Sequence, residues 1–107
     1  MNASELVGNQ GNHSLPDYSH TKNGRIYVKK DKRGFREMRV YDDDGKVILE
    51  IAFHPERNLD SSGSNVLHYH LYGKNFERSV AKAMDNEIYN LYKKYLNHWG
   101  IYWNEKK

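Results

Sequence analysis

The stretch MRVYDDDGKVILEI, residues 38 to 51, predicts the central element of the fold, because two apolar-patterned runs flank a tight turn signal. Asp44-Gly45 is typical of a two-residue type I′ hairpin turn, which pairs the residues placed symmetrically on either side of it. The cross-strand pairs expected on the apolar face of this hairpin are Val40 with Leu49 and Met38 with Ile51.

The reverse face of the predicted hairpin is polar. Arg39 lies opposite Glu50 there. Such an opposite-charge pair stabilises a hairpin by roughly a few tenths of a kcal/mol. A slip of one residue would mix the apolar and polar faces, so this register is favoured. Side chains alternate along a strand, which places His54 on the same side as Arg39 and Glu50.

A third strand, predicted for residues 66 to 72, carries two histidines on one face. Positions i and i+2 of a strand point the same way, so His68 and His70 face one side while Tyr69 faces a core. Paired imidazoles contribute little to packing, but they bind metals or transfer protons near neutral pH. We therefore expect His68, His70 and His54 within one open cleft on the polar face.

The C-terminal part predicts a long amphipathic helix. Apolar and aromatic residues recur at helical spacing from Ser79 to about His98, and Gly100 follows. The predicted fold class is α+β, a small antiparallel β-sheet packed on one face by a long C-terminal α-helix. We assign residues 25–107 to a single domain and residues 1–24, rich in Asn, Gly and Ser, to a flexible N-terminal arm or linker.

The length and composition of the chain are typical of a single modestly basic domain without disulfides. A chain of 107 residues suits one domain, and the lack of cysteine leaves neither a disulfide framework nor a thiolate metal site. No apolar run approaches the roughly 18 residues of a membrane span, and no signal-peptide pattern is recognised. The formal net charge is +3, so the chain is modestly basic.

Basic residues are concentrated before and within the first part of the hairpin. Such a cluster suits a polyanion, and a solvated strand edge protected by lysines is the alternative interpretation. The predicted nucleic-acid-binding residues are Lys29, Lys30, Lys32, Arg33 and Arg36, with Tyr72 available to stack on a base.

One interpretation of the histidines is phosphodiester cleavage without any cofactor. Cutting RNA at its 2′-hydroxyl requires a general base, a general acid and a cation for the charge of the phosphorane. Two imidazoles exchange the first two roles near neutral pH, so we assign proton transfer to His68 and His70, assisted by His54. The candidates for the cation are Arg39, Arg57 and Lys74.

The second interpretation is a metal centre that uses zinc or another divalent metal as its cofactor. The ligands predicted for this centre are His54, His68, His70 and Glu50. In a third interpretation these residues are only the solvent-facing side chains of an antiparallel sheet that has one covered face.

Four segments of the chain resemble the C-terminal toxin domains of bacterial polymorphic toxins of the contact-dependent inhibition, Rhs and wall-associated kinds. The segments are GRIY at 24–27, RVYDDDGK at 39–46, IAF at 51–53 and HYH at 68–70. In this resemblance a tyrosine–aspartate–glycine hairpin precedes a short histidine-bearing strand. The likeness covers about residues 24 to 74.

The resemblance implies a nuclease, commonly an RNase that acts on tRNA in the bacterial cytoplasm. It also implies delivery to other cells within a larger secreted protein, a cognate acidic immunity protein, and a site at His68 and His70 with His54. We predict a small basic ribonuclease toxin domain that uses histidine general acid–base chemistry. The alternatives are a metal-dependent nuclease with the same histidines and a non-catalytic module that binds nucleic acid or protein.

Overall fold

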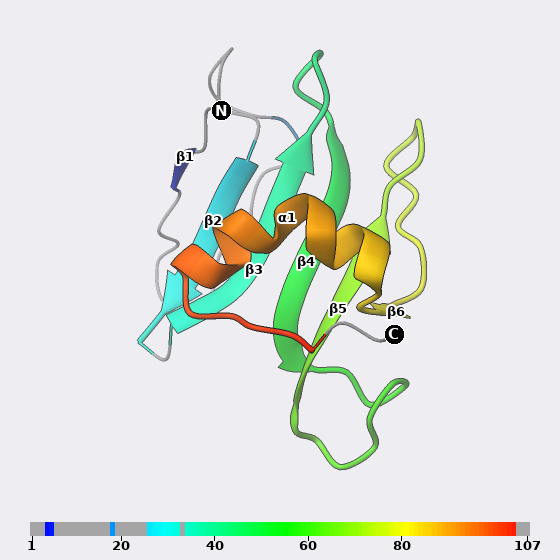
Figure 1. The fold of residues 1–107 in the computed structure, drawn as a ribbon. Helices are drawn as coiled ribbons and strands as arrows, with labels where there is room; N and C mark the ends of the chain where they lie inside the picture. The colour runs from blue at the N-terminus through cyan, green and yellow to red at the C-terminus, as the bar shows by residue number, and fades with distance from the viewer. Residues whose placement is uncertain (1–3, 6–17, 19–25, 33, 105–107) are drawn as a thin grey trace.

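The computed structural model describes residues 4–5, 18, 26–32 and 34–104 (Figure 1). The predicted α+β class is confirmed, because an antiparallel sheet is followed by a C-terminal helix. The elements are β1 (Ser4–Glu5), β2 (Ile26–Asp31), β3 (Gly34–Tyr41), β4 (Val47–Pro55), β5 (Asn65–Leu71), β6 (Lys82–Ala83) and α1 (Asn86–His98).

The sheet follows the order of the chain, β1-β2-β3-β4-β5-β6. Each pair from β2 to β6 is antiparallel, and β1 adds to the edge of β2 in the parallel direction. Neighbouring antiparallel strands require only short connections, so residues close in sequence become neighbours across the sheet. The histidine strand β5 thus lies directly beside β4 of the hairpin.

The predicted register of the β3–β4 hairpin is confirmed. Val40 pairs with Leu49, Met38 with Ile51 and Arg39 with Glu50. The hairpin therefore has the expected apolar and polar faces.

The predicted two-residue turn of this hairpin is wrong. Asp42 N donates to Lys46 O at 2.8 Å, which closes a three-residue loop that ends in Gly45 at φ 82°. This is the loop type that combines a type I turn with a glycine bulge. The register then shifts between Val40 and Tyr41, and Tyr41 lies opposite Val47. The shift absorbs the additional loop residue, so the strand pairs beyond it keep the predicted register.

The helix begins at Asn86 and not at Ser79. Asp85 caps it, because its carboxylate accepts a hydrogen bond from Ile88 N at 2.8 Å. The preceding segment pairs with the sheet instead: Ser79 N donates to Leu71 O at 2.8 Å, and Lys82–Ala83 forms β6. Hydrogen bonds to the open edge of β5 thus outweigh the local helical pattern of this segment.

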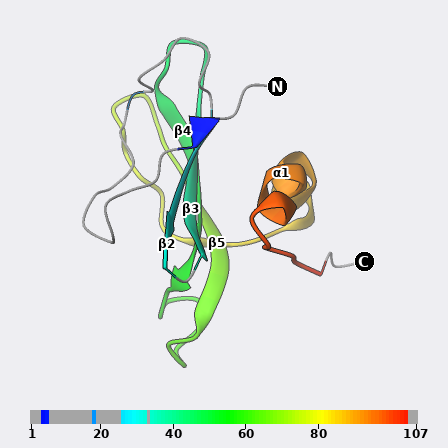
Figure 2. The same cartoon turned by 90° about the vertical axis from the view of Figure 1, so that its left-hand side faces the viewer.

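The main core lies between the sheet and α1, which runs along one face of the sheet (Figure 2). Met38, Ile51 and Leu96 have no exposed surface, and they belong to one buried cluster that joins the strands to the helix. Full burial of such a side chain contributes about 1.5–3 kcal/mol. Tyr69 on β5 also donates to Asp85 Oδ2 at 2.8 Å, which ties the helix cap to the sheet.

A smaller cluster covers part of the opposite face, near the turn of the hairpin. Tyr27, Tyr41 and Val47 are buried there, with Tyr72 and Phe76 packed against them. This end of the second face is therefore covered by aromatic rings, and the polar side chains occupy the part beside it.

Most of the predicted N-terminal arm lies outside the described residues. Two described pieces contact the domain: Ser4–Glu5 pairs with β2, and Tyr18 forms a bridge to Lys46. The ring of Tyr18 also lies 5.3 Å from that of Phe76. No helix within the described ranges has the length and apolar character needed to cross a membrane.

Candidate functional site

The face of the sheet away from α1 carries polar side chains in two adjacent rows. One row joins three strands, because Arg39 pairs with Glu50 and Glu50 pairs with His70. In the next row Ala52 pairs with His68. Direct cross-strand partners on one face lie close enough for their side chains to interact. Strand pairing alone thus assembles this group of residues.

The structure brings the three predicted histidines together. The ring centroids of His54 and His68 are 4.9 Å apart, and those of His68 and His70 are 5.5 Å apart. Both pairs meet edge to face. His68 is therefore the central ring of the three.

The prediction of an open cleft is wrong for the two histidines of β5. His68 is 0% exposed and His70 is 5% exposed, so neither faces solvent. Arg39 and Glu50 are buried beside them. Hydrogen bonds that link Arg39, Glu50 and His70 through Arg78 replace water around these three groups, so they form a polar cluster that can be buried. Among the three histidines, only His54 is partly exposed.

The Glu50 carboxylate is the centre of this network. Arg39 donates to Oε1 from Nε at 3.1 Å, and Arg78 donates to Oε2 from Nη2 at 3.4 Å. The Tyr72 hydroxyl donates to Oε1 at 3.2 Å and accepts from Arg39 Nη2 at 3.2 Å. Two guanidinium groups and a phenol offset the cost of burying this charge.

The phenol of Tyr72 remains a hydrogen-bond donor at neutral pH. Burial and the nearby Glu50 carboxylate raise its pKa to about 12. Tyr72 was predicted to stack on a base, and in the structure its hydroxyl is engaged with Glu50 and Arg39 instead of solvent.

The hydrogen bonds of His70 fix its protonation. Arg78 Nη2 lies 2.8 Å from Nε2, and an arginine side chain can only donate, so Nε2 accepts. Nδ1 lies 2.9 Å from Ser79 O, and a carbonyl can only accept, so Nδ1 carries the proton. His70 is thus a neutral imidazole in the Nδ1–H tautomer, held on both sides by consecutive residues.

His68 differs from His70 because one of its ring nitrogens has no partner. Nδ1 donates to Val66 O at 2.8 Å, whereas Nε2 is buried without a hydrogen bond to any described residue. Burial lowers the pKa of His68, which keeps the ring neutral and leaves the lone pair of Nε2 available. A buried acceptor without a donor is uncommon in folded proteins and marks this atom as a candidate reactive group.

Glu37 is a second titratable group on the same face. It pairs with Ala52 on one side and with Lys29 on the other. Burial raises the pKa of its carboxyl, the charge of Glu50 adds to this effect, and the charge of Lys29 opposes it. Perturbed carboxyl groups cluster at functional sites, so Glu37 is a candidate member of this one.

Two of the residues predicted to supply the cation, Arg57 and Lys74, make their contacts in loops and not in the histidine cluster. Arg57 Nη1 donates to Ser61 O at 2.9 Å in the loop after β4. Lys74 is exposed in the turn after β5, and its carbonyl accepts from Lys46 Nζ at 2.8 Å. Arg39 is the predicted cation that lies within the cluster.

The predicted basic cluster is divided between the two faces of the sheet. Lys29 is paired with Glu37 on the histidine side, whereas Lys30 Nζ lies 4.3 Å from the ring centre of Trp99 on the helix side. The other predicted basic residues are Lys32, which is exposed, Arg36, which is partly exposed, and Arg33, which lies outside the described residues.

Arg78 contacts both His70 and Glu50, and the sequence did not predict this residue as part of the site. The chain folds back after β5, with Gly73 N bonded to Glu77 O at 3.0 Å and a bridge between Tyr72 and Arg78. This turn returns Arg78 to His70. The turn signal at Gly73 was available in the sequence, but the helical pattern expected from Ser79 pointed away from a return to the sheet.

Zinc remains a prediction for this site. No group of three or more His, Asp or Glu side chains in the described part of the chain is arranged to hold a metal ion. The Nδ1–H groups of His68 and His70 do bond to carbonyl oxygens, which is how metal-binding histidines are oriented in proteins.

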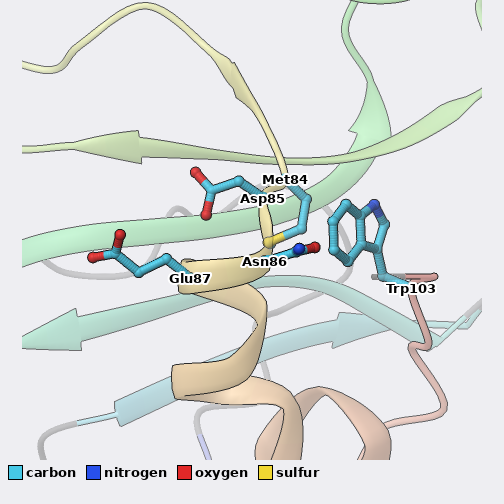
Figure 3. A pocket seen from close by; sticks show the side chains of 5 residues that line it. All are labelled: Met84, Asp85, Asn86, Glu87 and Trp103. Atoms are coloured by element: carbon cyan, nitrogen blue, oxygen red, sulfur yellow. The ribbon is translucent and has the colours of Figure 1, made fainter. Parts of the chain in front are cut away.

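A pocket of about 450 Å³ lies on the other side of the sheet, at the start of α1 (Figure 3). Asp85 is part of its wall, but both carboxylate oxygens of Asp85 are engaged, one with Ile88 N and one with the Tyr69 hydroxyl. The lining residues are Met84, Asp85, Asn86, Glu87 and Trp103. The histidine cluster, with its unpartnered ring nitrogen, is therefore the stronger candidate for chemistry.

Comparison of the chain with models of protein families, with curated proteins and with solved structures found no match.

Proposed function

We propose that this chain is a small nuclease domain that cleaves RNA by histidine general acid–base chemistry. The observation that carries the proposal is the buried His68 ring, whose Nε2 has no partner among the described residues. The ring lies between His54 and His70, and His70 contacts Arg78, which holds Glu50 together with Arg39. Metal-free RNA cleavage needs a general base, a general acid and a cation, and two imidazoles with a guanidinium can supply these three groups.

In this proposal the histidines have different roles. His68 is the general base, because its lowered pKa keeps Nε2 unprotonated at neutral pH. His54 is the general acid, because it is partly exposed and its ring is the edge-to-face neighbour of His68. His70 accepts from Arg78 and orients the arginine, although the sequence alone assigned it to proton transfer.

Access to His68 requires a side chain to move, since the ring has no exposed surface. His54 is the movable neighbour in the proposal, because its side chain is held by a 3.1 Å contact between Nδ1 and the carbonyl of the adjacent Pro55. Rotation of His54 would then present Nε2 of His68 to a 2′-hydroxyl.

The proposed substrate is RNA, with tRNA favoured by the resemblance to toxin domains. The same resemblance supports an acidic immunity protein as the partner and the bacterial cytoplasm as the place of action. Exposed Lys32 and partly exposed Arg36 are proposed to contact phosphates or the acidic partner.

Cleavage of a mixed tRNA substrate by the purified chain tests the proposal. His68→Ala should remove most of the activity, since an acid–base residue contributes about 10²–10⁴ in rate. His98→Ala is the matched control, because His98 is exposed at the end of α1. Full cleavage in excess chelator is expected, and loss on chelation that zinc restores would transfer the histidines to a metal centre. Equal cleavage by wild type and His68→Ala would contradict catalysis at this site.

A further inference from the structure

We propose that Arg78 is a phosphate-binding residue and that an anion bound to it is sensed directly by His70. The inference rests on the proposed function for its natural ligand, a phosphodiester of RNA, and it specifies which of the two arginines contacts the phosphate and how that binding reaches His70. Arg78 is suited to this role because its side chain is partly exposed and because its two side-chain contacts use the same nitrogen, Nη2.

Both contacts of Arg78 use the same nitrogen. Nη2 donates to His70 Nε2 at 2.8 Å and to Glu50 Oε2 at 3.4 Å. An arginine has five N–H groups, so three of them, on Nε and Nη1, donate to no other residue in the described part of the chain. The Arg78 side chain is 49% exposed. An exposed guanidinium with unused donors suits phosphate, because its planar fork matches the spacing of two phosphate oxygens.

Charge also favours an anion at Arg78. Glu50 is shared between two arginines, and its contact with Arg39 is the shorter at 3.1 Å. Arg39 is buried and bonds to Tyr72 as well, so Glu50 keeps its bonds to Arg39 and Tyr72 if Arg78 turns outward. The cluster of Arg39, Arg78 and Glu50 therefore carries one positive charge in excess, and the exposed part of that charge is on Arg78.

An anion on Arg78 would change the surroundings of His70. In the structure Arg78 is the donor to His70 Nε2, and Ser79 O holds the opposite nitrogen. A phosphate that draws the guanidinium outward weakens or removes the bond to Nε2, while Nδ1 remains on Ser79 O. The ring would then stay in place with a changed environment at one nitrogen, 5.5 Å from His68. Arg78 is thus a phosphate-binding residue that brings a phosphate beside the histidines.

Nitrogen NMR of the histidine rings in the intact chain tests this inference, with inorganic phosphate as the probe. Addition of phosphate at constant pH and ionic strength should move the His70 Nε2 resonance and leave His98 unchanged. Arg78→Gln should abolish the shift, and Arg78→Lys, which keeps the charge without the fork, should reduce it. Arg57→Gln is the control for loss of an exposed arginine, and it should respond as wild type does. Backbone amide spectra verify that each variant is folded.

The readouts separate this inference from RNA cleavage. A shift of His70 that depends on Arg78 supports phosphate binding, even if the chain does not cleave RNA. If RNA is cleaved, Arg78→Gln should raise KM about 10-fold or more, because the phosphate loses a charged hydrogen-bond donor. An unmoved His70 resonance in wild type, or the same shift in Arg78→Gln, would overturn the inference while leaving acid–base cleavage by His68 open to its own test.

Discussion

Three histidines that look equivalent in the sequence have different chemical surroundings. His70 has both ring nitrogens bonded, His68 has a buried nitrogen with no partner among the described residues, and His54 is partly exposed. Period-2 alternation places His68 and His70 on one face, but it cannot distinguish them. The difference arises because consecutive residues, Arg78 and Ser79, bond to opposite sides of the His70 ring.

The lowered pKa of His68 predicts how stability depends on pH. The ring titrates near 6.5 in the unfolded chain and at a lower pH in the folded chain, mainly because of burial. Between the two values the unfolded state binds more protons, so stability should fall as the pH is lowered below 6.5. His68→Asn keeps a donor for Val66 O and removes the titration, and it should flatten this part of the profile. Urea unfolding at about pH 5 and about pH 7 measures the difference.

His98→Asn serves as the control for that measurement, because His98 is exposed. It should preserve the wild-type dependence on pH. If the free energy of unfolding depends on pH in the same way in wild type and His68→Asn, then titration of His68 does not cause the loss of stability at low pH.

At the scale of elements, α1 depends on Asp85 for its first turn and for its connection to the sheet. One carboxylate oxygen accepts from Ile88 N and the other from the Tyr69 hydroxyl, both at 2.8 Å. The sequence predicted the end of this helix well and its beginning poorly. A helix start depends on competition with other hydrogen bonds, and here the edge of β5 captures the segment before Asp85.

Asp85→Ala should lower the free energy of unfolding by about 1–2 kcal/mol, because an N-cap is lost and Tyr69 loses its acceptor. Asp85→Asn, which retains an oxygen for Ile88 N, should lose less. Urea denaturation near neutral pH compares the two. Equal stabilities of Asp85→Ala and wild type would contradict the capping role, and equal losses in both variants would assign the effect to charge.

At the scale of the whole molecule, the sheet separates charges that are adjacent in the sequence. Lys29 lies on the histidine face beside Glu37, whereas Lys30 lies over Trp99 on the helix face. A basic cluster in the sequence is therefore not one basic surface. If RNA reaches the histidine cluster as proposed, Lys29 is placed to contact it and Lys30 is not.

Neighbouring lysines should thus differ in their effect on RNA binding. For the wild type, the logarithm of the binding constant should fall linearly with the logarithm of salt concentration, with a slope of about −0.7 for each phosphate neutralised on a single strand. Lys29→Gln should reduce the slope by about one phosphate, and Lys30→Gln should leave it nearly unchanged. Fluorescence anisotropy with a labelled RNA over a range of salt concentrations gives both slopes. Identical slopes for the two variants would contradict binding on the histidine face.

The sequence by itself determined the α+β class, the register of the β3–β4 hairpin and the common face of the histidines, Arg39 and Glu50. These follow from alternation along strands and from a turn signal, which are local properties of the chain. Only the tertiary structure decided that His68, His70, Arg39 and Glu50 are buried on this face, that Arg78 joins them and that the helix starts at Asn86. Each of these depends on a segment that folds back on β5 after a turn, and local periodicity carries no information about which hydrogen-bonding groups such a segment will meet.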